Sequence, residues 1–223
     1  MDAPGRDRRF IYSRHVVSWI SIAIERGQAM PTSMKTLLAE VRACQVCAAH
    51  LPHGPRPVIQ LGASARLVII GQAPGSKVHA SGVPWQDDSG DRLRDWTGLD
   101  AKAFYDPARV ALVPMGFCYP GAGDNADLPP RPECAPLWHA RLLAALAPSR
   151  LILLVGIHAQ GYYLKDQPKR TMTETVRGFA DYLPSFFPLP HPSWRSTGWM
   201  RKNPWFAAKV LPRLRQAVRT AVT

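Results

Sequence analysis

The stretch "ARLVIIGQAPG" (residues 65–75) joins a run of apolar β-forming residues to an abrupt loop that contains glycine and proline. A continuous apolar run of this length is typical of a parallel strand whose two faces are both covered. Three more runs of strand length follow it, at 109–115, 150–156 and 185–190. Helical patterns separate these runs, and strands that alternate with helices predict one three-layer α/β/α domain. We therefore expect a short, mainly parallel four-stranded central sheet.

Helices are expected at 37–43, 89–99, 133–146 and 157–164, and from Asn203-Pro204 towards the C-terminus. Ser89 is a plausible N-cap, because a serine hydroxyl accepts hydrogen bonds from the free N–H groups at a helix start. One face of the last helix carries only apolar residues and is expected to pack on the domain core. These residues are Phe206, Val210, Leu214 and Val218.

The chain has 223 residues, of which 46% are hydrophobic and 20% are charged, so one globular domain is expected. Its formal net charge of +12 is unusual and indicates a polyanionic partner, first a nucleic acid and second an anionic membrane surface. Charge that only keeps the protein soluble is the third explanation. No apolar run approaches the roughly 18 residues of a membrane span. We expect a soluble, cytoplasmic monomer with no membrane partner.

Residues 1–31 are basic and partly apolar, but Ser18 and Ser21 interrupt the apolar centre and no small-residue cleavage signature follows. They do not match a signal peptide. We expect an N-terminal extension that is either disordered or the product of a misassigned start, because Met30 and Met34 are alternative first residues. A single domain is predicted to span 32–223.

Three unusual segments follow predicted strands, at 71–85, 116–132 and 191–199. In open α/β sheets the ligand binds outside the carboxyl ends of the strands, so the fold alone brings these segments together. Trp85 is suited to stack on a planar base, and His191 lies between two prolines in rigid backbone. The plainer alternatives are a simple tight turn after the first strand, a core tryptophan and a structural histidine.

The four cysteines indicate a metal centre. Cys44 and Cys47 form a C-x-x-C motif, and Cys118 and Cys134 have fifteen residues between them. Without a secretory signal, disulfides are less expected than metal. Four thiolates from three segments suit a zinc ion or a four-iron cluster, whereas the C-x-x-C alone also suits a redox motif. Four unconnected thiols are the remaining alternative.

Taken in order, these motifs resemble the uracil-DNA glycosylase superfamily, and within it the iron–sulfur branch, family 4. The resemblance runs from about Cys44 to Leu214 and rests on the order and spacing of five elements. They are the C-x-x-C, Gly71-Gln-Ala-Pro-Gly75, Gly82-Val-Pro-Trp85, the pair Cys118 and Cys134, and His191-Pro-Ser193. The resemblance implies a uracil-DNA glycosylase-like fold in which the four cysteines hold a 4Fe-4S cluster, with structural zinc as the alternative.

The resemblance also implies an activity on DNA that contains a damaged or deaminated base. The nucleotide is flipped out of the stack, and its N-glycosidic bond is hydrolysed through an oxocarbenium-like sugar. His191 matches the family histidine that donates to the base oxygen, and Trp85 stands where a phenylalanine stacks on the base. The base pocket is expected to include Gly71, Gln72 and Ala73.

The first motif of this chain departs from the family pattern. Gln72 stands where family 4 has a glutamate, and Ala73 stands where another branch has a water-positioning aspartate. No carboxylate therefore lies within the motif. Asp87 and Asp88 are the nearest candidates for ordering the water. The alternative is that these acids belong to a solvated face and to the first turn of a helix, where carboxylates suit the dipole.

The second departure is Pro114, which stands where the family has its base-recognising asparagine. A proline has no side-chain amide, so uracil is not recognised at this position in the usual way. The Pro-rich segment 118–134 is expected to wrap the metal centre. Alternatively its residues Asp124, Asn125 and Asp127 reach the pocket and replace the asparagine.

The third departure follows the histidine motif. Ser193 is expected to hold a DNA phosphate. Trp194 and Arg195 come next, where the family has a proline and an apolar wedge, and Arg195 could fill the gap left by a flipped base. We predict a DNA repair glycosylase that removes uracil or another deaminated base. The alternative is a superfamily member that binds nucleic acid without excising a base.

Overall fold

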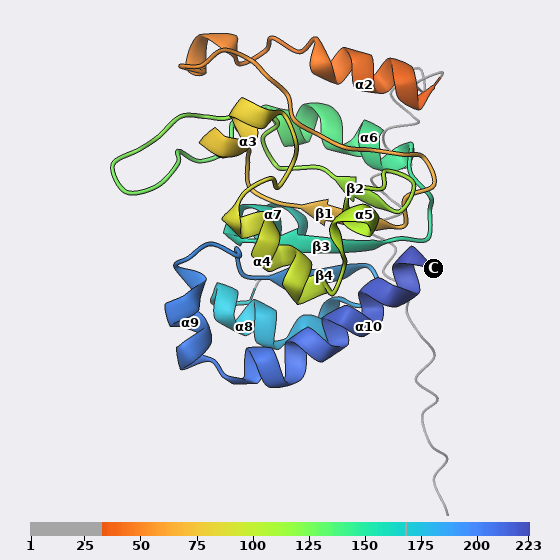
Figure 1. Ribbon diagram of the computed structural model, residues 1–223, viewed down its shortest axis with the longest axis vertical. Helices are drawn as coiled ribbons and strands as arrows, with labels where there is room; N and C mark the ends of the chain where they lie inside the picture. The colour runs from red at the N-terminus through yellow and green to blue at the C-terminus, as the bar shows by residue number, and fades with distance from the viewer. Residues whose placement is uncertain (1–32, 168) are drawn as a thin grey trace, which may run out of the picture. The chain divides into compact units, whose positions relative to one another are not determined.

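The computed structural model describes residues 33–167 and 169–223. At its centre lies a sheet of four parallel strands in the order β2-β1-β3-β4 (Figure 1). The strands are β1 (Leu67–Ile70), β2 (Val110–Leu112), β3 (Leu151–Val155) and β4 (Phe186–Leu189). Each lies within one of the four predicted apolar runs, so the predicted three-layer fold with a four-stranded sheet is confirmed. The prediction for residues 1–31 lies outside the described residues.

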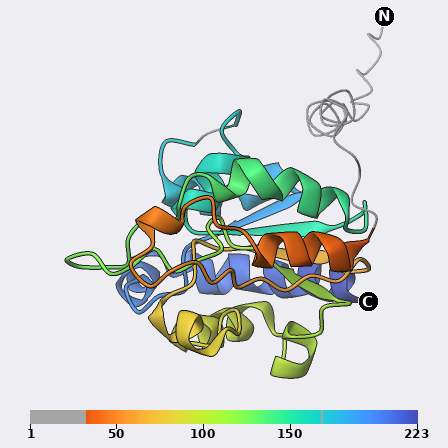
Figure 2. The same cartoon turned by 90° about the horizontal axis from the view of Figure 1, so that it is seen from above.

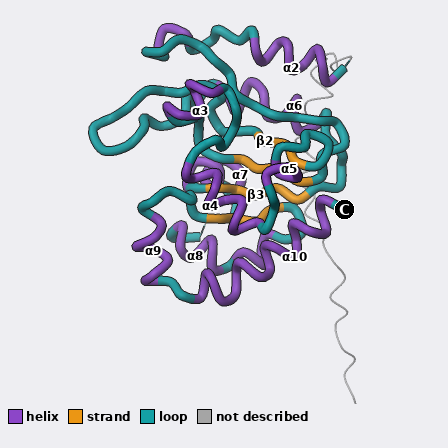
Figure 3. The backbone as a smooth tube through the Cα atoms, viewed as in Figure 1, coloured by secondary structure: helices purple, strands orange, loops and turns teal. Residues whose placement is uncertain are grey.

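The pairing register puts the carboxyl ends of the strands at one edge of the sheet. Leu67 of β1 is paired with Val110 of β2 and with Leu151 of β3. At the other end, Val155 of β3 is paired with Leu189 of β4. Figure 3 shows the strands at the centre of the domain with helices on both sides. The loops that follow the four strands therefore leave from the same edge.

Among the described residues, one α-helix precedes the first strand, others connect successive strands, and two follow the last strand. They are α2 (Met34–Arg42), α3 (Ser76–Ser81), α4 (Asp88–Thr97), α5 (Ala101–Phe104), α6 (Ala140–Ala144), α7 (Ile157–Tyr163), α8 (Met172–Arg177), α9 (Ser196–Lys202) and α10 (Leu211–Val222). A helical turn at Ala135–His139 leads into α6, and another at Phe206–Val210 leads into α10. Shorter turns lie at Ala48–His50 and Phe179–Tyr182. In the described ranges, every helix falls short of the length and apolarity that crossing a bilayer requires.

Alternate residues of the strands face two different helical layers. Val68 and Ile70 of β1 belong to a buried cluster that includes residues of α2, α6 and α7. Leu67 and Ile69 belong to a second cluster that includes residues of α4, α8 and α10. Figure 2, seen from above, shows α2 in front of the strands and α10 behind them. Both faces of the sheet are covered, which is why the strands are continuous apolar runs rather than alternating ones.

The predicted apolar face of the last helix is confirmed, because its four residues are all buried: Phe206, Val210, Leu214 and Val218. The predicted N-cap Ser89 is wrong. Asp87 caps α4 instead, and its Oδ1 accepts from the Gly90 N–H at 2.8 Å. Aspartate offers the same kind of acceptor together with a negative charge at the helix start. Helix α3 was not expected, because Val78 is its one buried side chain and it has no apolar period.

His139 is a buried residue that joins three elements. Its Nε2 lies 3.0 Å from the carbonyl oxygen of Pro114, after β2, and its Nδ1 lies 2.6 Å from the hydroxyl of Tyr163 in α7. A carbonyl only accepts, so Nε2 carries the proton and Nδ1 accepts from the tyrosine. Burial lowers the pKa of His139 to about 4, although the bond to Pro114 acts in the opposite direction. The imidazole is therefore neutral at pH 7.

We predict that His139 makes the folded state less stable in acid. Its folded pKa near 4 lies below the ordinary value of 6.5, so protonation favours the unfolded chain. The contribution of His139 to the free energy of unfolding is fully present above pH 6.5. It falls by about 3 kcal/mol as the pH is lowered to 4. Denaturant unfolding of the wild type and of His139→Gln at pH 7 and at pH 4 measures this. The wild type should lose more unfolding free energy than the variant, and equal losses would contradict the assignment.

Candidate functional site

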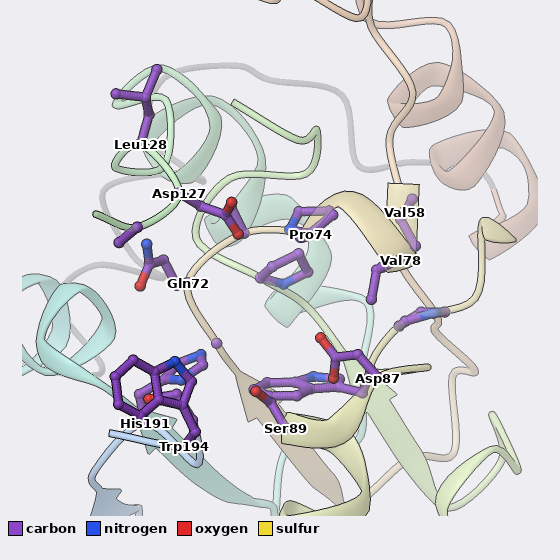
Figure 4. Close-up of a pocket in the computed structure, with 18 of the residues that line it drawn as sticks. Val58, Gln72, Pro74, Val78, Asp87, Ser89, Asp127, Leu128, His191 and Trp194 are labelled. Atoms are coloured by element: carbon purple, nitrogen blue, oxygen red, sulfur yellow. The ribbon is translucent and has the colours of Figure 1, made fainter. Parts of the chain in front are cut away.

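A cavity of about 500 Å³ lies at the carboxyl edge of the sheet. Figure 4 shows side chains of several segments directed towards it. The segments lie after β1 (71–75), before and within the start of α4 (84–89), after β2 (at Pro114 and at 125–128) and after β4 (191–195). The structure thus brings together the three segments that the sequence places at strand ends. Val58 and Val78 also line the cavity with apolar side chains, and no sequence pattern identified them as site residues.

Trp85 is held in a fixed place between β1 and α4. Its φ of 58° lies in the left-handed region, which residues with a side chain rarely adopt. Its indole packs on Gly71, where an added Cβ would lie 2.5 Å from the ring, and its carbonyl packs on Gly90, where an added Cβ would lie 1.7 Å from the oxygen. Tyr105 donates its hydroxyl proton to the same carbonyl at 3.2 Å. The two glycines therefore determine where the indole lies.

His191 follows β4, and its ring lies next to that of Trp85 in the lining of the cavity. The two ring centroids are 5.9 Å apart, and the ring planes are inclined by 29°. Burial lowers the pKa of His191, the charge of Asp87 raises it, and His158 lowers it further. The net lowering keeps the imidazole neutral at pH 7. A neutral imidazole donates one hydrogen bond and accepts one, which suits it to hold a polar atom of a ligand.

The two candidate acids point to different places. Asp87 lines the cavity while its Oδ1 caps α4. The side chain of Asp88 is 92% exposed and pairs with Lys77 at 3.2 Å, and Asp88 is not one of the residues that line the cavity. The structure therefore brings Asp87, but not Asp88, to the site.

The loop after β1 forms the back of the cavity. Gln72 and Ala73 line it, as does Gly71. The carbonyls of Gly71 and Gln72 accept from the N–H groups of Met115 and Gly116 at 2.9 and 3.0 Å. These bonds fasten the loop to the chain that follows β2, so the Gln72 side chain is presented from a rigid turn. Pro114 also lines the cavity, where it offers no side-chain hydrogen bond.

The residues predicted to bind DNA lie at the mouth of the cavity. Ser193, Trp194 and Arg195 all line it. Trp194 is 76% exposed, and the Arg195 guanidinium lies over its ring at 5.4 Å from the centroid. Arg92, which the sequence did not single out, donates to the Ser193 carbonyl at 2.5 Å and so fixes this turn to α4.

The loop after β2 contributes residues that the sequence left open. Asn125 and Asp127 line the cavity, whereas Asp124 does not. Tyr119 donates its hydroxyl proton to Oδ1 of Asp127 at 3.3 Å. Arg195 donates to the carbonyl of Asn125. Tyr119 was missed, although its place next to Cys118 was the signal that could have drawn attention to it.

The four cysteines lie outside this cavity and are all unpaired thiols. Burial is the main cause that raises the pKa of Cys118 to about 11 and that of Cys134 to about 12. Cys44 and Cys47 contribute to both in the same direction, and a backbone hydrogen bond acts against them at each thiol. Among the described residues, no three His, Cys, Asp or Glu side chains are arranged to hold a metal ion. The donor type nevertheless suits a metal centre, because four thiols from three segments are available and thiolates are the ligands of structural zinc and of four-iron clusters.

The sequence that forms the site matches a known protein family. The family model described as the Uracil DNA glycosylase superfamily matches residues 59–215, well over half of the 223 residues. The matched range contains every residue that lines the cavity except Val58. It includes Cys118 and Cys134 and begins after the C-x-x-C motif.

We predict that Gly90→Ala destabilises the protein, although alanine at an open helical position stabilises by up to about 1 kcal/mol. The added Cβ would lie 1.7 Å from the Trp85 carbonyl oxygen, so Trp85 or α4 must move, at a cost of about 1–3 kcal/mol. Gly161→Ala in α7 is the matched control, because an added Cβ there meets nothing within 4 Å. Urea unfolding should show a loss for the first variant and none for the second. A stable Gly90→Ala variant would show that the indole is not fixed in this way.

Proposed function

Because the chain belongs to the uracil-DNA glycosylase superfamily, we propose that it is a DNA glycosylase of base-excision repair. In this proposal it flips uracil or another deaminated base into the cavity and hydrolyses the N-glycosidic bond. The observation that carries the proposal is the pair Trp85 and His191, a fixed aromatic face and a neutral imidazole 5.9 Å apart beside one cavity. A flipped base needs a stacking surface, and its oxygen needs a hydrogen-bond donor when it leaves.

The proposed chemistry begins with cleavage of the bond between C1′ and the base nitrogen. The base takes the bonding electron pair and leaves as an anion, and the sugar becomes an oxocarbenium-like cation. His191 donates an N–H to the base oxygen on which the negative charge develops. This bond strengthens as the charge grows, so it stabilises the transition state more than the bound substrate.

Asp87 is the residue that we assign to the attacking water. It lines the cavity and interacts electrostatically with His191. Its Oδ1 accepts from the Gly90 N–H, so we assign Oδ2 as the atom that orients the water. The water oxygen adds to C1′ and its proton passes to the carboxylate, which leaves an abasic sugar. That proton then neutralises the base anion, so the free base is released and the carboxylate is restored.

The DNA strand is proposed to cross the mouth of the cavity at 193–195. The exposed Trp194 ring offers a stacking surface for a base next to the flipped one. Arg195 adds a cation close to that ring, and Ser193 is proposed to hold a phosphate. The net charge of +12 supports a general, salt-sensitive attraction to the DNA backbone.

We further propose that Cys44, Cys47, Cys118 and Cys134 hold a 4Fe-4S cluster, with structural zinc as the alternative. Such a group would cross-link the segment after α2 to the two ends of the loop 118–134. Its role is then to hold that loop, and through it the wall of the cavity. No step of the proposed chemistry passes through it.

The glycosylase proposal is tested with oligonucleotides that carry one uracil, hypoxanthine or xanthine, followed by alkaline cleavage of abasic sites. We expect the wild type to release at least one of these bases. His191→Ala should lower the single-turnover rate about 100- to 1,000-fold, because the donor to the base oxygen is lost. DNA binding should change little.

His158→Gln is the control for this experiment. His158 interacts electrostatically with His191 but does not line the cavity, so its loss should change the rate only slightly. If the wild type binds DNA in a salt-sensitive manner and releases no base, the enzyme proposal fails. The chain would then be a nucleic-acid-binding member of the superfamily that does not excise bases.

The metal proposal is tested by absorption and metal analysis of the purified full chain. A 4Fe-4S cluster predicts a broad visible absorption, with iron and sulfide in equal amounts, and Cys118→Ala should abolish both. A colourless protein that contains zinc would replace the cluster with the zinc alternative. Protein without iron or zinc, prepared under anaerobic conditions, would contradict both.

A further inference from the structure

Pro114 lies in the part of the cavity wall that follows β2, and its side chain cannot recognise a base by hydrogen bonding. Proline has no side-chain donor or acceptor, and its carbonyl already accepts from His139 at 3.0 Å. Recognition of a flipped base nevertheless depends on hydrogen bonds to its edge. Within the loop that follows β2, the segment 125–128 supplies the polar side chains that line the cavity.

This segment belongs to a short hairpin, residues 121–128, with a defined shape. Ala122 and Asp127 pair in an antiparallel bridge, and the Leu128 N–H donates to the Gly121 carbonyl at 2.9 Å. The hairpin is part of the green loop that projects at the left of Figure 1. Its second half returns to the cavity, where Arg195 from the opposite rim donates to the Asn125 carbonyl.

Asp127 is held in this hairpin by Tyr119. The buried Tyr119 donates its hydroxyl proton to Oδ1 of Asp127 at 3.3 Å. The tyrosine ring stacks on His53 at 5.3 Å and lies against His79 at 5.8 Å, and these two histidine rings are 5.8 Å apart, so the tyrosine is part of one cluster of three rings. Oδ2 of Asp127 lies 3.3 Å from the place that a Cβ on Gly75 would take. In Figure 4 the carboxylate points inwards, on the side of the cavity away from His191.

We propose that Asp127 is a specificity-determining residue whose Oδ2 accepts a hydrogen bond from a ring N–H of the flipped base. This inference rests on the proposed glycosylase function. An ionised carboxylate only accepts hydrogen bonds. In uracil attached to deoxyribose, N3–H is the single N–H group of the base, so it is the group that Asp127 contacts.

The chemistry of deamination then defines the substrate class. In cytosine N3, and in adenine N1, is a bare ring nitrogen with an outward lone pair. Deamination to uracil or hypoxanthine places a proton on that nitrogen and turns it into a donor. A carboxylate attracts the N–H of the product and repels the lone pair of the parent base. Asp127 therefore selects deaminated bases of both ring sizes, and the exclusion of thymine and guanine, which carry the same N–H, depends on the shape of the cavity.

The test compares the excision of uracil with that of 3-methyluracil, in which a methyl group replaces the N3 proton. The wild type should strongly prefer uracil. Asp127→Ala should lower the ratio of the two single-turnover rates about 10- to 100-fold, because both the acceptor and the group that the methyl would strike are removed. The isosteric Asp127→Asn should lower the ratio by less. Tyr119→Phe should shift it in the same direction, because the carboxylate is then free to turn.

Asp124→Ala is the matched control, because Asp124 lies in the same hairpin without lining the cavity. It should leave the ratio unchanged. If Asp127→Ala and Asp127→Asn both lower the two rates equally, Asp127 does not contact N3 and the inference is overturned while the glycosylase proposal stands. If the wild type releases no base at all, the glycosylase proposal fails first, and the inference fails with it.

Discussion

The carbonyl group of Trp85 rests on the Cα of Gly90, and the geometry of the candidate site depends on this contact. Between these residues lies Asp87, whose carboxylate accepts from the Gly90 N–H and starts α4. The indole, the acid and the helix start are therefore one rigid unit, seated on Gly71 at the end of β1. The relative position of the aromatic surface and the acid is set by backbone packing, which is stiffer than side-chain rotamers would be.

Most of the fold could be predicted from the sequence, because both faces of the sheet are covered and each strand is a continuous apolar run. The boundaries were harder. Ser89 and Asp87 are equally good caps by residue type, and it is the carboxylate of Asp87 that accepts from the Gly90 N–H in the structure. Helix α3 has six residues and one buried side chain, so the 3.6-residue period on which helix prediction rests is not expressed in it.

The convergence of the three strand-end segments was predictable, because parallel strands end at one edge. Which side chains reach the cavity was not. Asp87 and Asp88 are neighbours in sequence, but Asp87 is the extended N-cap residue and Asp88 is the first residue of the helix. Their side chains therefore leave the backbone in different directions, and one lines the cavity while the other pairs with Lys77. Asp127 reaches the cavity because Tyr119 holds its carboxylate. A contact of this kind forms only in the folded loop, and it produces no periodic pattern from which it could be predicted.

The bond from Arg195 to the carbonyl of Asn125 joins the two rims of the cavity mouth through a main-chain group. Every amino acid has the same main-chain carbonyl, so this hydrogen bond does not depend on which side chain is present at position 125. The side chains that the hairpin directs into the cavity can therefore be replaced without loss of its contact with the opposite rim, provided that Arg195 is kept. The shape of this loop is thus held by a main-chain atom, whereas the chemistry that it presents to the cavity is set by its side chains.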